Sequence, residues 1–357
     1  MSKRPPQPLR GRGARSAPDN RFETLSRELT DDGWGSLEQA PTSVCTTVQR
    51  DASRSVVVYN RSPDVPFDRS INPYRGCEHG CIYCFARPTH AYLGLSAGLD
   101  FETQLFYKPD AASLLREELA RPNYVCAPIA LGVNTDAYQP IERRLGITRG
   151  ILETLQQCQH PVSLITKSSL IERDIDVLAD MAQQNLTHVA VSITTLQPAL
   201  ARTLEPRAAT PQRRLETIAR LTEAGIPVSI LVAPLIPVLT DSELESILAK
   251  ARAAGASDAA YVLLRLPHEV KDLFREWLEE HQPLQAKHVM SRVRDARDGR
   301  DNDAKFGSRM RGTGIFAELL SQRFAVAYSR LGFCAPAQLK TDRFERPVRT
   351  SGQLALF

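Results

Sequence analysis

Three cysteines in one short stretch, Cys77, Cys81 and Cys84, are the residues whose type and spacing point most directly to chemistry. The sequence has seven cysteines in 357 residues, so a chance cluster of three is a weak explanation. A structural zinc site needs four ligands, and neither His79 nor His90 completes a familiar zinc spacing. Three thiolates from a short loop instead suit a cubane iron–sulfur cluster, in which one iron is left open for another ligand.

The elements that must position this loop alternate between strand and helix. Apolar, β-branched stretches indicate a short strand at 70–74 and buried strands at 127–133, 161–166, 188–195, 227–236 and 259–266. Helices are expected at about 148–159, 171–184, 213–225, 242–255 and 270–281. Strands about thirty residues apart, apolar on both faces, predict an α/β fold with a parallel sheet. Six such units form either a partial (β/α)6 TIM-like barrel or an open doubly wound sheet, with the active site at the carboxyl ends of the strands.

The rest of the chain is expected to flank this core. We predict a disordered basic tail, an N-terminal extension, the barrel domain and a C-terminal accessory helical region, over residues 1–20, 21–68, 69–267 and 268–357. Two strands are expected within the extension, inside 41–60. A helix within 303–333 is expected to cover the barrel.

The net charge of +4 is unevenly placed. Residues 1–16 hold five Lys or Arg and no acid, and residues 287–311 hold eight Lys or Arg against four aspartates. Such segments suit a polyanion such as nucleic acid, or they are simply solvated surface. The longest apolar run, 226–239, is too short and too rich in proline to cross a bilayer, and the first twenty residues show no secretory signal. We therefore expect a cytoplasmic protein with reduced cysteines and no membrane partner.

The cysteine spacing, with the aromatic Tyr83 just before the last cysteine, resembles the signature of the radical S-adenosylmethionine (SAM) superfamily. The resemblance implies a [4Fe–4S] cluster held by Cys77, Cys81 and Cys84, with SAM chelating the open iron. It also implies reductive cleavage of SAM to a 5′-deoxyadenosyl radical, which abstracts hydrogen from a substrate. An electron donor such as flavodoxin or ferredoxin would supply the electron, and the fold would be the partial (β/α)6 barrel.

A narrower resemblance is to the branch that contains spore photoproduct lyase and uncharacterised relatives called "DNA repair photolyase". The segments that carry it are NTDAYQPIE (134–142), ITKS (165–168), VSIT (191–194), LEPRAATPQRRL (204–215) and VAPLIP (232–237). In that branch a lysine after strand three and a serine in strand four contact SAM, and these match Lys167 and Ser192. The resemblance implies that Lys167 meets a carboxylate, that Ser192 and Thr194 meet ribose hydroxyls, and that Tyr83 lies against the adenine. Asn134 is assigned to the same cofactor site.

One departure from that branch concerns the hydrogen donor. Spore photoproduct lyase carries a cysteine just upstream of a Ser/Thr-Asp pair, and the residue aligned to it here is Val133. The nearest thiol, Cys126, lies eight residues before Asn134, which is about 26 Å along an extended strand. Lyase activity on thymine spore photoproduct is therefore not expected, although the residues for radical generation are present.

Other polar residues give weaker signals. Asp136 and Tyr138 are candidate catalytic residues, and with Glu142 they are expected to face the mouth of the barrel. Glu205 and Arg207 are expected to pair with each other or to bind an anion.

Arg265, near the end of the sixth strand, is expected to reach a phosphate or carboxylate.

Taken together, these features favour a lyase-like radical SAM enzyme that acts on a nucleic-acid base, in repair or modification. The same chemistry on a peptide or small metabolite stays open. So do a non-catalytic iron–sulfur redox protein and a zinc-stabilised nucleic-acid binder.

Overall fold

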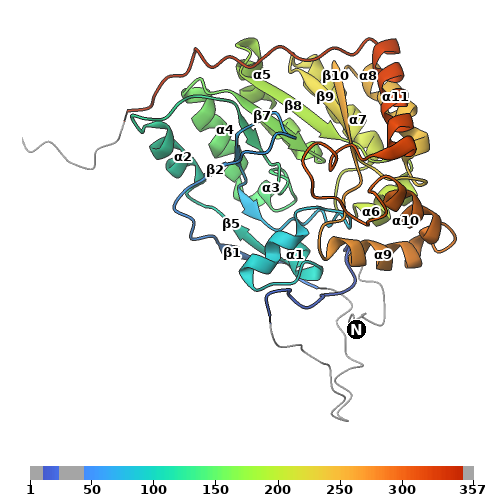
Figure 1. Cartoon of the computed structure of the whole chain (residues 1–357). Coiled ribbons are helices and arrows are strands. Elements are labelled where there is room, and N and C mark those ends of the chain that lie inside the picture. Colours follow the sequence, from blue (N-terminus) through green and yellow to red (C-terminus); the bar gives the residue numbers. More distant parts are fainter. Residues whose placement is uncertain (1–10, 24–43, 349–357) are drawn as a thin grey trace, which may run out of the picture.

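A seven-stranded sheet forms the centre of the protein, seen here in a computed structural model that describes residues 11–23 and 44–348 (Figure 1). Its strands lie in the order β10-β9-β8-β7-β6-β3-β2, and all pairs are parallel except β2 with β3. They are β2 (Val57–Tyr59), β3 (Arg69–Ile71), β6 (Ile129–Leu131), β7 (Val162–Thr166), β8 (Thr187–Ser192), β9 (Val228–Leu235) and β10 (Asp258–Leu263). Six parallel strands in chain order confirm the predicted α/β fold with a parallel sheet.

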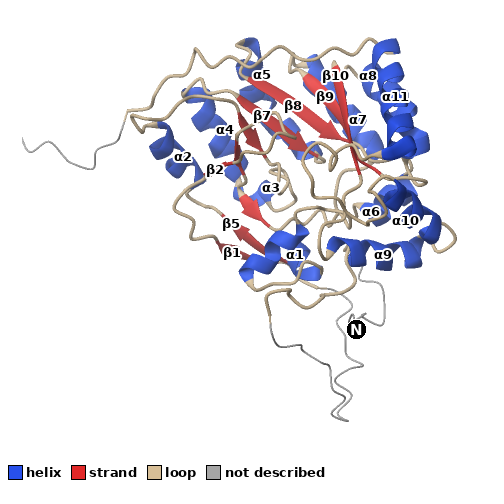
Figure 2. Cartoon of the chain, viewed as in Figure 1, coloured by secondary structure: helices blue, strands red, loops and turns tan. Residues whose placement is uncertain are grey.

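Helices follow the strands and cover one side of the sheet, as Figure 2 shows. These are α4 (Ile147–Gln157), α5 (Ile175–Gln183), α7 (Pro211–Glu223) and α8 (Leu244–Ala253). The helix after β10, α9 (Val270–His281), lies apart from them (Figure 1) and packs in a second apolar cluster. The sequence of α7 explains its limits: the Thr210 hydroxyl accepts a hydrogen bond from the Arg213 amide, and Pro211 occupies the first turn. After the helix, Gly225 takes a positive φ of 78°, a conformation that glycine adopts without steric cost.

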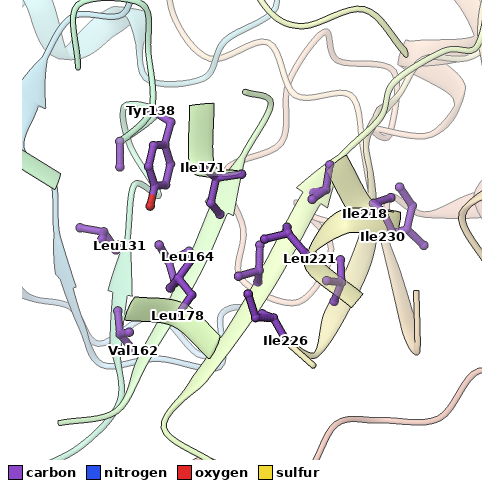
Figure 3. Close-up of a cluster of buried hydrophobic side chains, with 14 of the residues drawn as sticks. Leu131, Tyr138, Val162, Leu164, Ile171, Leu178, Ile218, Leu221, Ile226 and Ile230 are labelled. Atoms are coloured by element: carbon purple, nitrogen blue, oxygen red, sulfur yellow. The ribbon is translucent and has the colours of Figure 1, made fainter. Parts of the chain in front are cut away.

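The core lies between the sheet and these helices. One register row crosses five strands through Ile71, Leu131, Leu164, Val189 and Val228, all buried. Figure 3 shows strand side chains of this core among side chains from α5 and α7. Full burial of one such side chain stabilises the fold by about 1.5–3 kcal/mol. The apolar row therefore fixes the strand register and leaves the carboxyl ends of the strands free for polar residues.

Several elements were not predicted from the sequence. A second sheet, of order β1-β5-β4, joins β1 (Thr47–Arg50), β5 (Gln104–Tyr107) and β4 (Tyr74–Arg75). Short helices occupy the connections: η1 (Arg87–Leu93), α1 (Leu99–Thr103), α2 (Ala111–Leu119), α3 (Glu142–Leu145), η2 (Ser169–Asp174), α6 (Pro198–Leu204) and η3 (Asp241–Glu243). Of the two strands expected within 41–60, β1 joins this second sheet and β2 joins the main one.

The N-terminal segment 11–23 packs against the body of the protein. The backbone amides of Gly13 and Ala14 donate to the buried Glu102 carboxylate at 2.9 and 2.8 Å, and Asn20 donates to Ala91 O at 2.8 Å. The disorder that we expected for residues 11–20 is therefore wrong, because a buried carboxylate binds the backbone of a segment whose composition suggested disorder. Residues 1–10 of the predicted tail lie outside the described residues, and the domain boundaries stay a prediction.

The C-terminal part adds α10 (Ala286–Asp295) and α11 (Gly314–Arg330) to α9 (Figure 1). The basic stretch 287–311 does not form a free cationic surface. Arg297 is buried and donates to four carbonyl groups, those of Leu263, Leu264, Ser308 and Arg309. The expectation that this stretch is available to phosphates is therefore corrected for Arg297, which links the end of β10 to the loop that follows α10.

Ion pairs with acids also reduce the free positive charge of this stretch: Arg294 Nε lies 2.9 Å from Asp301, and Arg309 pairs with Asp64.

A helix that crosses a membrane must be both long and apolar. Among residues 11–23 and 44–348, none of the helices combines the length and apolar character needed to cross a bilayer.

Substituting Gly13 tests the packing of the N-terminal segment. A Cβ at Gly13 would overlap the carbonyl oxygen of Gly80, so Gly13→Ala should lower the free energy of unfolding by about 1–3 kcal/mol. Gly150, inside α4, is the control because a Cβ there would meet only Ala112 Cβ at 3.5 Å. Gly150→Ala should raise stability by about 0.5–1 kcal/mol. Urea unfolding of both variants measures the difference, and an unchanged midpoint for Gly13→Ala would contradict the packing described.

Candidate active site

The cysteine loop runs between β4 and η1 at the carboxyl ends of the sheet strands. Gly76, at φ 78°, begins it, and a Cβ there would lie 2.9 Å from Phe101 O, so only glycine fits. Cys77 and Cys81 are buried and Cys84 is partly buried, and none is in a disulfide. Cys84 packs against the apolar clusters that contain Cys77 and Cys81. The loop thus gathers its three thiols in one region.

The three thiols lie within electrostatic reach of one another. Burial raises the pKa of each, and for Cys77 the charges of Asp136, Cys81 and Cys84 raise it further. For Cys81, burial and the Glu205 carboxylate raise the pKa to about 12, against an opposing effect of Lys167. Ionisation of these thiols therefore calls for nearby positive charge, which a bound metal group supplies.

The donor set fits an iron–sulfur cluster. Thiolate sulfur is the ligand that such clusters prefer, and three thiols from one loop leave one iron for another ligand. Within the described part of the chain, no three His, Cys, Asp or Glu side chains are placed to hold a single metal ion. A cubane does not require that convergence, because it binds each thiolate at a different iron.

A buried ion pair supports the outer side of the loop. Arg87 and Glu102 pair with both side chains fully buried, and Arg87 also donates to Cys81 O at 2.9 Å and to Gly80 O at 3.1 Å. Glu102 in turn accepts the amides of the N-terminal segment. The guanidinium therefore fixes the loop backbone, and the carboxylate fixes the segment that covers it. Neither residue was singled out in the sequence.

Asp136 anchors the loop to the strand ends. Its carboxylate lies 3.3 Å from His79 Nδ1 and accepts from Thr166 Oγ1 and the Lys167 amide, both at 2.8 Å. Burial alone would raise the pKa of Asp136, but His79 and these hydrogen bonds hold it below the usual value. Gln139 adds a second link, because its side chain accepts from the Glu78 amide at 2.8 Å and donates to Gly76 O at 3.1 Å.

A polar group beside the loop joins four segments around Glu205. Lys167 Nζ lies 2.7 Å from Ser192 Oγ, 3.4 Å from Thr194 Oγ1 and 3.1 Å from Glu205 Oε1. The Tyr83 hydroxyl also donates to Glu205. The sequence placed Tyr83, Lys167, Ser192 and Thr194 at one site, and the structure brings these four side chains together.

Glu205 is a buried carboxylate held in its charged form. Burial would raise its pKa, but Arg214 and Lys167 lower it far below the usual value. Arg214 is itself fixed by hydrogen bonds to Ala209 O at 2.8 Å and to Ser192 O at 2.9 Å. The signal for this pair was present in the stretch LEPRAATPQRRL, which places an acid and an arginine nine residues apart.

Other expected site residues lie elsewhere. Tyr138 is 1% exposed and lies among Leu131, Ile171 and Leu178 (Figure 3). The expectation that it faces the barrel mouth is therefore wrong, because its ring completes the apolar core. Asn134 is exposed, and its amide donates to Asn72 Oδ1 at 2.8 Å.

Two further expectations are corrected by buried pairs. Glu142 is buried against Arg173, at 2.8 Å, and the Thr148 amide, so it does not face the mouth either. Arg207 pairs with Glu78 at 2.9 Å, whereas Glu205 pairs with Arg214 and Lys167. Sequence proximity suggested a Glu205–Arg207 pair, but the turn after α6 directs the two side chains toward different partners.

The chain belongs to the radical SAM superfamily, whose family model matches residues 71–251, about half of the chain. An uncharacterised protein of Mycobacterium tuberculosis is 41% identical over 233 residues, which is 65% of this chain and 67% of the relative. An uncharacterised protein of Methanocaldococcus jannaschii is 27% identical over 173 residues, 48% of this chain and 62% of the relative. Membership implies an iron–sulfur cluster and SAM, and it supports radical SAM chemistry.

The fold is similar to that of solved spore photoproduct lyases. A mutant of that enzyme superposes with a TM-score of 0.57 at 14% identity, covering 82% of this chain and 81% of the other. Another, with bound AdoMet and dinucleoside spore photoproduct, has a TM-score of 0.56 at 12% identity over the same shares. This likeness confirms the resemblance as one of fold, and a partial TIM barrel is consistent with it.

The cysteine triad can be tested by metal content. Cys81→Ala removes one of three thiols, so anaerobically purified protein should lose most of its iron and its absorption near 400 nm. Cys126→Ala, a partly buried thiol outside the loop, should retain both. Full iron content in the Cys81 variant would contradict the assignment of the ligands.

The Glu205 group can be tested by stability. Glu205→Gln leaves Arg214 and Lys167 without a buried counter-charge, which should cost about 3–5 kcal/mol of unfolding free energy. Glu216 lies at the surface, 3.8 Å from Arg213, and accepts a hydrogen bond from Gln212 Nε2 at 3.2 Å. Glu216→Gln should therefore cost less than about 1 kcal/mol. Equal unfolding midpoints in guanidinium for the two variants would show that Glu205 contributes no more to stability than the surface residue Glu216.

Proposed function

We propose that the protein is a radical SAM enzyme that binds a [4Fe–4S] cluster through Cys77, Cys81 and Cys84 and abstracts hydrogen from a nucleic-acid base. When bound, the cluster supplies one electron for the reductive cleavage of SAM, whose deoxyadenosyl group then takes the hydrogen atom. The observation that carries the proposal is the contact between Tyr83, the neighbour of Cys84, and the Glu205 group. It joins the thiols to the polar strand ends in one site.

We assign SAM binding to the polar strand ends beside the thiols. Lys167 would bind the SAM carboxylate. Glu205, 3.1 Å from Lys167 Nζ, would hold the Lys167 ammonium group in position. Ser192 and Thr194 would offer hydroxyl groups to the ribose, and Tyr83 an aromatic face to the adenine. In the present arrangement Ser192 Oγ donates to Ala233 O at 3.0 Å, and Thr194 Oγ1 donates to Glu205 Oε1 at 2.8 Å. Binding therefore requires these hydroxyl groups to exchange partners.

Asp136 would act as a positioning residue. Its carboxylate already binds His79, Thr166 and the Lys167 amide, so it holds the cysteine loop against the end of β7. Asn134, exposed at the end of β6, stays a candidate contact for SAM. An external reductant such as flavodoxin or ferredoxin would deliver the electron, and we place the enzyme in the cytoplasm.

The nucleic-acid substrate is supported by two observations. One solved structure of similar fold carries a dinucleoside spore photoproduct, and Arg265, just after β10, makes a poor set of hydrogen bonds that leaves it open to an anion. Val133 occupies the place of the cysteine hydrogen donor in spore photoproduct lyase, so the reaction would be a different base repair or base modification. A peptide or small metabolite is the alternative substrate, and a non-catalytic redox protein is the alternative function.

Reductive cleavage of SAM tests the proposed chemistry. Cluster-replete protein reduced with dithionite should form 5′-deoxyadenosine from SAM even without a substrate. Lys167→Gln should weaken SAM binding by about 10- to 150-fold through the loss of a charge-assisted contact worth about 1.5–3 kcal/mol. Lys250→Gln, on the exposed side of α8, should not change the affinity measured by calorimetry. If cluster-replete protein forms no 5′-deoxyadenosine, the redox-protein alternative is favoured.

A further inference from the structure

Two exposed phenylalanines lie in segments next to the proposed site. Phe85 directly follows Cys84 and is 47% exposed, and Phe306, in the loop after α10, is 60% exposed. Neither ring takes part in the contacts that hold the cysteine loop or the Glu205 group. Large aromatic side chains left in contact with solvent at a binding surface commonly mark a recognition site.

An arginine accompanies each of these rings. Arg265 Cζ lies 5.8 Å from the ring centroid of Phe85, and Arg309 Cζ lies 4.6 Å from that of Phe306. Arg265 comes just after β10, at the carboxyl edge of the sheet. Burial lowers the pKa of Arg265, and the positive charge of Arg309 lowers it further, so the two guanidinium groups are close enough to repel. The surface thus presents two ring-and-cation pairs.

Arg265 lacks a full set of hydrogen-bond acceptors. Within the described residues its Nε is buried without a partner, and Nη1 reaches only the thioether sulfur of Met310 at 3.6 Å. The nearest acids are engaged: Asp64 pairs with Arg309, and Asp303 binds the Ser308 hydroxyl. A thioether is a weak acceptor, and a partly buried cation that makes no ion pair among the described residues is costly. An incoming anion would therefore bind favourably here.

We propose that Phe85 and Arg265 bind one nucleotide of a single strand, with the base on the Phe85 ring and a phosphate on the Arg265 guanidinium. The exposed Phe306 ring offers a stacking surface to the base of a neighbouring nucleotide, while Arg309 stays paired with Asp64. The inference rests on the proposed nucleic-acid substrate and identifies its form as unpaired. Two exposed rings and one arginine without an ion pair among the described residues suit successive bases and a phosphate of one strand. A protein ring can stack only on a base that is free of its duplex. A lone carboxylate would use Arg265 but neither ring.

Binding of a labelled oligonucleotide tests this inference. Fluorescence anisotropy with cluster-replete protein compares a single strand with the matching duplex over a series of salt concentrations. Wild-type protein should prefer the single strand. Phe85→Ala should weaken its binding by about 5- to 150-fold, as expected from stacking of about 1–3 kcal/mol per base, without changing the salt dependence. Arg265→Gln should weaken binding and also reduce the slope of log K against log salt by about 0.7.

Matched variants separate recognition from folding. Phe85→Trp, which keeps an aromatic face, should retain binding. Phe22→Ala removes an exposed ring outside the proposed site. Arg292→Gln removes an arginine whose Cζ lies 5.9 Å from the ring centroid of Phe316. Both variants should bind the oligonucleotide as wild-type protein does. Iron content and 5′-deoxyadenosine formation without substrate should be unchanged in Phe85→Ala and Arg265→Gln, since neither residue belongs to the cofactor site.

The outcomes distinguish this inference from the proposed function. If wild-type protein binds no DNA or RNA in a salt-dependent manner, the nucleic-acid substrate itself is refuted, and the nucleotide site with it. If wild-type protein binds the single strand but Phe85→Ala and Arg265→Gln bind equally well, only the nucleotide site is refuted. Equal affinity of wild-type protein for duplex and single strand would also refute it, because stacking on Phe85 needs an unpaired base.

Discussion

The geometry of the site depends on the contacts of one buried carboxylate, that of Glu205. It binds Lys167 at the end of β7, Thr194 after β8, Arg214 on α7 and Tyr83 in the cysteine loop. Taking these charges out of water is expensive, so the group is stable only while every member keeps its partners. That requirement sets the distance between the cysteine loop and the strand ends more strictly than apolar packing would.

A second buried carboxylate, Glu102, holds the other side of the same loop. It pairs with Arg87, which binds the loop backbone, and it accepts the amides of Gly13 and Ala14. The loop with the three thiols therefore lies between two acid–arginine pairs, one from the barrel and one from the segment around α1. Such double support suits a loop whose thiols must keep fixed relative positions while a multi-iron group is bound.

Of the residues that would recognise a substrate, Phe85 shares a segment with the thiols and the others do not. Phe85 belongs to the cysteine loop, whereas Arg265 lies just after β10 and Phe306 lies in the loop that follows α10. Arg297 holds that loop to β10 by binding carbonyl groups on both. In a superfamily with a shared radical-forming site, variation of such loops changes the substrate without disturbing the barrel.

The sequence by itself determined the main features of this protein. Alternating apolar strands and helices specified the parallel α/β sheet, and the spacing of Cys77, Cys81 and Cys84 identified the loop that gathers three thiols, because both signals lie in local patterns. Tertiary structure alone decided which polar residues meet. Glu205 pairs with Arg214 and not with Arg207, Tyr138 enters the core, and residues 11–23 pack on Glu102, because these outcomes depend on contacts between segments far apart in the chain. Local sequence patterns cannot encode which buried charge meets which partner, because a buried charge is tolerated only beside an opposite charge and the tertiary fold decides which one lies there.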